Sequence, residues 1–261
     1  MSALTRIALN GASGRMGQAL LRLLGEQGGL QLVAGVVRAG SAAESTACNP
    51  AGLVFTSSVP ADVEIDVLID FAGAQAFDAA LQLACQRGAA FVSGSTGLSA
   101  AQHAALQVAA ETIPVLWSPN FSLGVVVLAE LLEQAARLLP EWDCEILESH
   151  HRHKLDAPSG TALMLGARAA QGRGQDPRVS SLLDPDRSGA RVTGSIGYAV
   201  TRGGDVVGEH HAILFGDGER VELIHRASNR DIFARGALTA ASWIAGRAPR
   251  VYQLRDVLQA P

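Results

Sequence analysis

The sequence predicts an α/β protein with a Rossmann-like dinucleotide-binding domain and a second α+β domain built on a mainly antiparallel or mixed sheet. Up to residue 117, short apolar runs alternate with helix-length segments, and a glycine-rich turn directly follows the first run. After Asn120, strand-like runs are joined by short glycine-rich turns, which favour antiparallel pairing. We expect residues 1–121 and 231–261 to form the first domain and residues 122–230 the second.

The composition excludes several classes of protein. Of the 261 residues, 18% are charged and 48% are hydrophobic, which excludes a disordered chain. The 21 basic and 25 acidic residues give a net charge of −4, which argues against a nucleic-acid partner. The sequence has no apolar run of about 18 residues and no signal-peptide pattern, so no membrane partner is expected. Cys48, Cys85 and Cys144 are too far apart for a metal knuckle or a disulfide framework, which fits a reducing cytoplasm.

The first domain is expected to alternate strands and helices. Apolar runs bounded by turn residues predict strands at Arg6–Asn10, Leu32–Val37, Leu53–Thr56, Ile65–Phe71, Ala90–Ser93 and Ile113–Trp117. Helices are predicted at Met16–Leu24, at Gln75–Gln86, and from Ser99 as the N-cap to Glu111. Strands separated by helical stretches of this length form βαβ units, so the sheet should be parallel.

The second domain is expected to begin with a long helix at Leu123–Leu139, which ends at Pro140. Strands are predicted at Cys144–His151, Gly194–Thr201, Val206–Leu214 and Arg220–His225. Another helix should start at Thr161, and residues 171–192 should form a mobile surface loop because they are rich in Gly, Asp, Pro, Arg and Ser. From Asp231 a helical pattern returns and ends at Gly246.

The turn after the first strand carries Gly11, Gly14 and Gly17 and opens a helix. This arrangement lets a pyrophosphate approach the backbone at a helix N-terminus, so it predicts dinucleotide binding, with a simple packing turn as the alternative. About 20 residues further on, where enzymes that use NAD place an acid, the sequence has Val37 and Arg38. Arg38 can pair with a 2′-phosphate, which favours NADPH without excluding NADH; the alternative is a solvated loop arginine.

Residues 148–162, ESHHRHKLDAPSGTA, hold three of the seven histidines and the only lysine of the chain. A zinc site is one interpretation, but His150 and His151 would point to opposite faces of a strand, and the segment has no cysteine. Lys154 can pair with a carboxylate and also release a proton, which arginine effectively cannot. Histidine titrates nearest to physiological pH. The segment therefore predicts proton transfer rather than metal binding.

The DAPSG turn at residues 156–160 leads into the next helix. Pro158 and Gly160 shape this turn, and either Ser159 or Thr161 can cap the helix. The N–H groups of Gly160 and Thr161 at the helix start are predicted to bind an anion such as a carboxylate. The alternative interpretation is an ordinary N-cap, which holds for Ser159 whatever the function.

With these motifs the chain resembles the 4-hydroxy-tetrahydrodipicolinate reductase (dihydrodipicolinate reductase) family over nearly its whole length. The matching segments are GASGRMG at 11–17, DF at 70–71, GSTG at 94–97, NFSLG at 120–124, ESHHRHKLDAPSGTA at 148–162, IGYAVTRGGDVVGEH at 196–210 and RDVL near the end. The histidine–lysine segment is the most specific of them. The resemblance implies an oxidoreductase that uses NAD(P)H to reduce 4-hydroxy-tetrahydrodipicolinate to tetrahydrodipicolinate in the diaminopimelate and lysine pathway.

The resemblance also implies a role for each matching residue. His150 is the proton donor and acceptor, and Lys154 is the proton donor. The substrate carboxylates are bound by His151, Gly160 and Thr161. The dinucleotide is contacted by Arg38 and by Gly11, Ala12, Ser13, Gly14, Arg15, Met16, Gly94, Ser95, Thr96, Ser118, Pro119, Asn120 and Phe121. No metal ion is implied.

The resemblance further implies a homotetramer, formed through the sheet of the second domain, which also binds the substrate. Val37 stands where the family often has an acid, so NADPH is expected to be preferred over NADH, and Ala72 removes one hydroxyl contact to the cofactor. A non-catalytic protein that senses NADPH would explain the glycine turn but not the histidine–lysine segment. Another imine or amine dehydrogenase would share the glycine turn but not the DAPSGTA turn.

Overall fold

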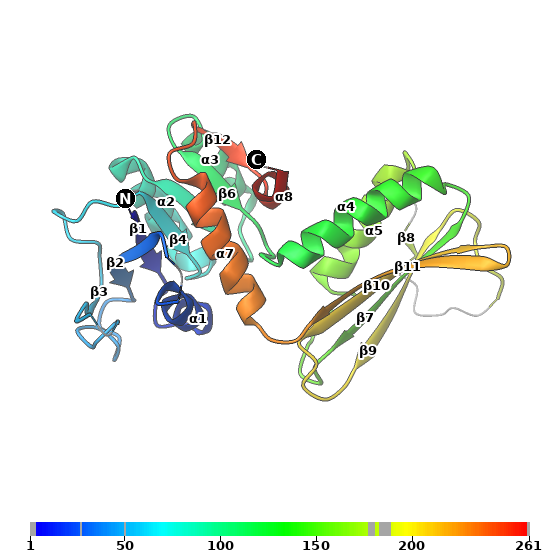
Figure 1. The fold of residues 1–261 in the computed structure, drawn as a ribbon, viewed down its shortest axis with the longest axis horizontal. Coiled ribbons are helices and arrows are strands. Elements are labelled where there is room, and N and C mark those ends of the chain that lie inside the picture. Colours follow the sequence, from blue (N-terminus) through cyan, green and yellow to red (C-terminus); the bar gives the residue numbers. More distant parts are fainter. Residues whose placement is uncertain (1–3, 27, 50, 177–180, 183–188, 260–261) are drawn as a thin grey trace. The chain divides into compact units, whose positions relative to one another are not determined.

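The computed structural model describes residues 4–259 except residues 27, 50, 177–180 and 183–188. The chain divides into two compact units (Figure 1). Unit 1 comprises Met1–Leu123 and Asp231–Pro261, and unit 2 comprises Gly124–Arg230. Within the described residues, no helix combines the length and the apolar character needed to cross a membrane.

Unit 1 is built on a seven-stranded sheet in the order β12-β6-β5-β4-β1-β2-β3. Its strands are β1 (Thr5–Asn10), β2 (Leu30–Val36), β3 (Phe55–Thr56), β4 (Val67–Asp70), β5 (Ala90–Ser93), β6 (Pro114–Trp117) and β12 (Arg250–Tyr252). Every pairing between them is parallel. The carboxyl ends of the strands therefore meet along one edge, where ligands bind in such sheets. The predicted Rossmann-like sheet is confirmed.

Helices cover both faces of this sheet: α1 (Arg15–Leu24), α2 (Ala74–Arg87), α3 (Ala100–Ala109) and α7 (Asp231–Ile244), followed by α8 (Leu254–Gln259). On one face, Phe77 of α2 and Leu106 of α3 pack into a buried cluster with Leu68 and Phe91 of the strands. Ile69, next to Leu68, points to the other face because side chains alternate along a strand. On that face α1 and α7 pack against each other, and α7 contacts the central strands (Figure 1).

The helix starts and ends follow local rules. α3 begins at a capping box in which Ser99 Oγ accepts the N–H of Gln102 and the Gln102 side chain accepts the N–H of Ser99. The predicted N-cap is therefore confirmed, although the helix ends at Ala109 instead of Glu111. β12 and α8 were not predicted, because elements of three and six residues carry too little periodicity to stand out in a sequence.

Unit 2 holds a five-stranded sheet in the order β11-β10-β7-β9-β8. Its strands are β7 (Asp143–His150), β8 (Ser181–Leu182), β9 (Ile196–Arg202), β10 (Gly208–Gly216) and β11 (Glu219–Ala227). β10 pairs antiparallel with β7 and β11, whereas β9 pairs parallel with β7 and β8, so the sheet is mixed as predicted. The short glycine-rich turn after β9 does not make an antiparallel pair of β9 and β10, because β7 lies between them in the sheet. Of the loop predicted at 171–192, residues 177–180 and 183–188 lie outside the described residues; of the rest, α5 extends to Gly172 and residues 181–182 form β8.

Two helices, α4 (Leu123–Leu138) and α5 (Gly160–Gly172), pack on one face of the unit 2 sheet. Buried and half-buried residues alternate along β7, so Cys144, Ile146, Glu148 and His150 all point to this covered face. Cys144 and Ile146 belong to the apolar core of the unit, together with Leu165 of α5. Glu148 and His150 continue the same row past the core, which places a carboxylate and an imidazole inside the protein.

Candidate functional site

The glycine turn lies at the carboxyl end of β1. Gly11 has φ +78°, in the left-handed region that favours glycine. Gly17 packs so tightly that a Cβ there would lie 2.4 Å from the carbonyl oxygens of Gly11 and Ala12. The N-cap of α1 is Gly14, which has no side chain to cap the helix, and the first turn of α1 carries no acidic residue. The start of α1 therefore suits an anion such as a pyrophosphate.

A cavity of about 800 Å³ adjoins this turn in unit 1. Gly11, Ser13 and Gly14 line it from the glycine turn, and Arg38 and Ser57 line it from the loops after β2 and β3. Its walls thus offer a helix N-terminus, hydroxyl groups and a guanidinium, which are donors that phosphate and ribose oxygens accept. Arg38 is exposed, so its side chain can reach a phosphate in the cavity.

A buried carboxylate joins three strand ends of unit 1. Asp70, at the end of β4, accepts hydrogen bonds from Asn10 Nδ2 at 2.8 Å, from Ser93 Oγ at 2.8 Å and from Ser95 Oγ at 2.7 Å. Ser95 Oγ in turn accepts the N–H of Gly73 at 2.9 Å. The Ser95 hydroxyl is therefore engaged inside the protein, and the network fixes the backbone of the GSTG turn. The role of Asp70 was not among the sequence-based predictions.

The other residues expected to contact the dinucleotide also lie in unit 1 and differ in exposure. Among them, the exposed residues are Ser13, Gly14, Arg15, Thr96 and Pro119, and the half-buried ones are Gly11, Met16, Gly94, Ser118 and Asn120. Ala12 and Phe121 are buried, and the Phe121 ring packs against Phe71 with their centroids 5.6 Å apart. These two residues can offer a ligand only their backbone.

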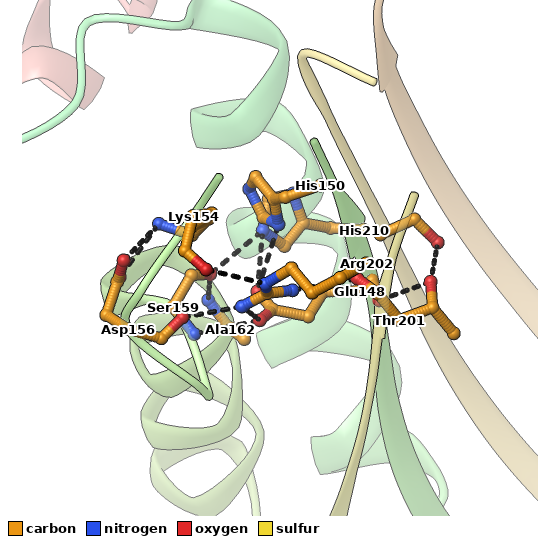
Figure 2. Close-up of polar contacts among 10 residues, drawn as sticks. Glu148, His150, Lys154, Asp156, Ser159, Ala162, Thr201, Arg202 and His210 are labelled. Carbon is orange, nitrogen blue, oxygen red and sulfur yellow. Dashed lines mark hydrogen bonds and ion pairs between the residues drawn. The ribbon is translucent and has the colours of Figure 1, made fainter. Parts of the chain in front are cut away.

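In unit 2, Glu148 lies at the centre of a polar cluster (Figure 2). Its Oε1 accepts the N–H of Ser159 at 3.0 Å and a guanidinium N–H of Arg202 at 3.3 Å. Its Oε2 lies 3.6 Å from His150 Nδ1 and also 3.6 Å from His210 Nε2. One carboxylate therefore connects β7, β9, β10 and the start of α5.

Burial and neighbouring charges determine the protonation states in this cluster. Burial raises the pKa of Glu148, but the nearby His210 imidazole and the hydrogen bond from Ser159 outweigh it and lower that pKa to about 2. Burial lowers the pKa of His150 to about 4, although the charge of Glu148 opposes this shift. At neutral pH the carboxylate is therefore charged and the His150 ring is neutral. A negatively charged ligand beside the ring would favour its protonated form.

Lys154 lies on the turn that follows β7, and its side chain is 19% exposed. Its Nζ donates to both carboxylate oxygens of Asp156, at 2.7 and 2.8 Å (Figure 2). Arg202 donates to the carbonyl oxygen of Lys154 at 3.3 Å and to that of Asp156 at 2.5 Å. Arg202 thus fixes the backbone of the turn that carries the lysine. The contributions of Asp156, Arg202 and His210 were not predicted from the sequence.

The start of α5 is the predicted anion-binding turn. Ser159 is the N-cap, since its Oγ accepts the N–H of Ala162 at 3.2 Å, and Thr161 lies inside the helix. Gly160 is exposed, and nothing lies within 4 Å of the place where a Cβ would be. The first N–H groups of a helix have no acceptor within the helix, and its dipole favours an anion there. Gly160 and Thr161 therefore stand where a carboxylate can bind.

The histidines of the segment separate in the structure. His150 is buried beside Glu148 and His210, whereas His151 is half-buried and lies 3.3 Å from a guanidinium nitrogen of Arg230. Glu148, His150 and His210 offer donor atoms within 4.8 Å of one another, a spacing that a metal ion can also use. Arg202 already places a positive charge on this carboxylate, so the cluster suits two imidazoles sharing one carboxylate better than a divalent cation.

Comparisons with known proteins cover both units. Residues 5–121 match the family model "Dihydrodipicolinate reductase, N-terminus", and residues 124–258 match "Dihydrodipicolinate reductase, C-terminus". The 4-hydroxy-tetrahydrodipicolinate reductase of Stenotrophomonas maltophilia (strain R551-3) is 50% identical over 255 residues, which cover 97% of this chain and 98% of that protein. The reductase of the same name from Xanthomonas axonopodis pv. citri (strain 306) is 49% identical over 253 residues, 97% of each chain.

The fold is also found in a solved structure. The dipicolinate-bound dihydrodipicolinate reductase from Paenisporosarcina sp. TG-14 matches with a TM-score of 0.80 and 22% sequence identity. The match covers 96% of this chain and 98% of that one. At this identity the similarity establishes a shared fold.

Proposed function

Because the chain belongs to the dihydrodipicolinate reductase family, we propose a role in that reaction for each residue of the two sites. The protein is an NAD(P)H-dependent oxidoreductase that reduces 4-hydroxy-tetrahydrodipicolinate to tetrahydrodipicolinate in diaminopimelate and lysine biosynthesis. The observation that carries this function is the match of relatives about 50% identical over 97% of the chain. The roles of individual residues below are proposals.

The reaction gives the chain three tasks. Loss of water from the 4-hydroxy substrate leaves a conjugated cyclic imine with two carboxylates, and its reduction adds one hydride and one proton. A nicotinamide cofactor supplies the hydride when it is bound. The chain must hold that cofactor, neutralise the two carboxylates and deliver the proton.

His150 and Lys154 deliver the proton in this proposal. The His150 ring is neutral at pH 7, and the dianionic substrate favours its protonation, so the ring can take a proton and pass it on. Lys154 carries a positive charge held by Asp156, and a lysine ammonium can both pair with a substrate carboxylate and donate a proton. Their combined charge offsets the negative charge of the substrate.

The carboxylates bind to His151 and to the first turn of α5 at Gly160 and Thr161. The N-terminal position of both residues in α5 supports this role. The Ser159 N–H donates to Glu148, which fixes the turn that leads into these two residues. Arg230, beside His151, adds a positive charge near this end of unit 2.

The glycine turn and the adjoining cavity hold the cofactor. The close packing at Gly17 and the uncapped start of α1 fit a pyrophosphate, and the GSTG turn and residues 118–121 line the rest of the dinucleotide. NADPH is preferred over NADH, because Arg38 lines the cavity and Val37 offers no carboxylate for a ribose hydroxyl.

The assembly is a homotetramer formed through the unit 2 sheet, and the enzyme works in the cytoplasm. On the sheet face opposite α4 and α5, Phe215 and Ile224 are 37% and 39% exposed, which supports an interface there. The described structure has Cys48, Cys85 and Cys144 as free thiols, which suits a reducing compartment.

The activity is tested by NADPH oxidation, followed by absorbance, with and without the product of dihydrodipicolinate synthase. Rapid oxidation that depends on this product is expected, and no oxidation should occur in its absence. A protein that only senses NADPH would bind the cofactor and oxidise none. No oxidation with either NADPH or NADH would contradict the proposed function.

A further inference from the structure

The mechanism above uses the His150 imidazole but assigns no role to the carboxylate beneath it. Glu148 has a side-chain exposure of 0% and lies two residues before His150 on the same face of β7. The β7–β10 register sets His210 directly opposite Glu148. A charged group this deeply buried is retained only where several partners satisfy it.

Two imidazoles face one carboxylate oxygen. The rings of His150 and His210 meet edge to face, with their centroids 5.2 Å apart and their planes at 75°. Nδ1 of His150 and Oε2 of Glu148 are both buried, and neither has a hydrogen-bond partner within the described part of the chain. They face each other at 3.6 Å, so a shift of about half an ångström forms a hydrogen bond. Catalytic hydrogen bonds often tighten in this way when a substrate binds.

The other nitrogen of the His150 ring points to a place where the neighbouring strand has no side chain. A Cβ on Gly208 of β10 would lie 3.1 Å from His150 Nε2 and 3.4 Å from its Cδ2. That separation is tighter than an ordinary van der Waals contact, so a side chain at Gly208 would crowd this nitrogen. Glycine keeps the space beside Nε2 open.

We propose that Glu148 is a positioning residue that holds the Nδ1–H of His150, so that Nε2 is the nitrogen that exchanges the proton with the substrate. The proposal rests on the proposed function, which assigns proton transfer to His150. The other oxygen of Glu148, Oε1, accepts the N–H of Ser159. The same carboxylate therefore also sets the distance between the His150 imidazole and the turn that binds the substrate carboxylate.

The pH dependence of the reaction reports on this arrangement. The charged and titratable groups around the His150 ring are Glu148 on β7, His210 on β10, Arg202 on β9 and Lys154 on the following turn. Of these, Glu148 alone favours the protonated ring, and the other three oppose it. Removing the charge of Glu148 should therefore shift the titration of His150 toward lower pH.

The first experiment compares Glu148→Gln with wild type. This variant keeps the shape of the side chain and removes its charge, so kcat should fall at least tenfold, and its pH profile should move to lower pH. The KM for NADPH should stay the same. The matched control is Glu145→Gln, which removes a carboxylate from the opposite face of the same strand and should leave both kcat and the pH profile unchanged. A Glu148→Gln profile that superimposes on that of wild type would overturn the proposal.

The second experiment needs no folded Glu148 variant. Nitrogen-15 NMR of the wild-type protein, with His150→Gln to assign the signal, should show the neutral His150 ring protonated on Nδ1. A ring protonated mainly on Nε2 would overturn the proposal. Gly208→Ala should lower kcat and leave this tautomer unchanged. If wild type oxidises neither NADPH nor NADH, the proposed function is contradicted instead; the NMR measurement does not depend on that activity.

Discussion

Replacement of Lys154 by arginine separates the charge of this residue from its proton. In the structure, Nζ donates to both oxygens of Asp156, at 2.7 and 2.8 Å. A guanidinium can make the same two-pronged contact with a carboxylate, so Lys154→Arg keeps the positive charge and its anchor. What the variant loses is a proton that can be transferred near neutral pH.

The expected loss of kcat is large compared with any effect of the substitution on stability. A positioned proton donor typically contributes about 10²- to 10⁴-fold to a rate, or about 2.7–5.4 kcal/mol of transition-state stabilisation. The Lys154–Asp156 pair itself contributes little to folding, because Asp156 is 60% exposed and such pairs are worth about 0–1 kcal/mol. A loss of several orders of magnitude in kcat therefore cannot come from unfolding.

Steady-state NADPH oxidation measures the outcome. Lys154→Arg should lower kcat by about two to four orders of magnitude while the KM for the dicarboxylate rises less, and Lys154→Ala should impair both. Circular dichroism melts of the variants should match wild type. If Lys154→Arg retains near-normal kcat, the lysine acts only as a charge and His150 is the sole proton donor.

Other perturbations test the remaining assignments. Arg38→Ala should raise the KM for NADPH more than that for NADH, because only NADPH has a 2′-phosphate; equal changes would contradict this. Sedimentation at micromolar concentration should show a homotetramer, and a monomer would exclude it. The free energy of unfolding, from denaturant titrations, should fall as the pH drops from about 6.5 to about 4, since the unfolded chain protonates His150 at higher pH than the folded one. In His150→Gln the free energy of unfolding should lose this part of its pH dependence. The same dependence in wild type and variant would refute the lowered pKa of His150. Gly17→Ala should lower Tm by roughly 3–10 °C, because its Cβ would meet the Gly11 and Ala12 carbonyls; an unchanged Tm would show that the turn can relax.

Helices and strands were predictable where a periodic apolar pattern was bounded by turn residues or proline. β5 (Ala90–Ser93) coincides with its prediction, because an apolar run ends at the GSTG turn. The long helix α4 (Leu123–Leu138) was found for the same reason, since a long apolar pattern stops before Pro140. β8 (Ser181–Leu182) was missed because a two-residue strand has no period and exists only through its pairing with β9.

The candidate site was predictable only where its residues are neighbours in sequence. His150, Lys154 and the turn at Ser159 fall in one segment, but Arg202 and His210 join it through strand register, which the sequence does not display. Asp70 did leave a signal, because an acid that ends a fully apolar strand must be buried and needs several donors. The donors themselves, on β1, on β5 and in the turn after β5, could be found only in the folded chain.

The division of unit 1 between two stretches of chain affects the order in which the protein can fold during synthesis. Unit 2 is continuous, from Gly124 to Arg230, so a ribosome completes it before α7 emerges. Until then unit 1 lacks the helix that packs on α1 and on the central strands, where Gly236 approaches Phe121 so closely that a Cβ would lie 1.8 Å from its carbonyl oxygen. At about 5–20 residues per second the interval lasts about 5 to 25 seconds. Apolar side chains such as Ile69 are exposed to solvent during this time. Aggregation therefore competes with folding at this stage of synthesis.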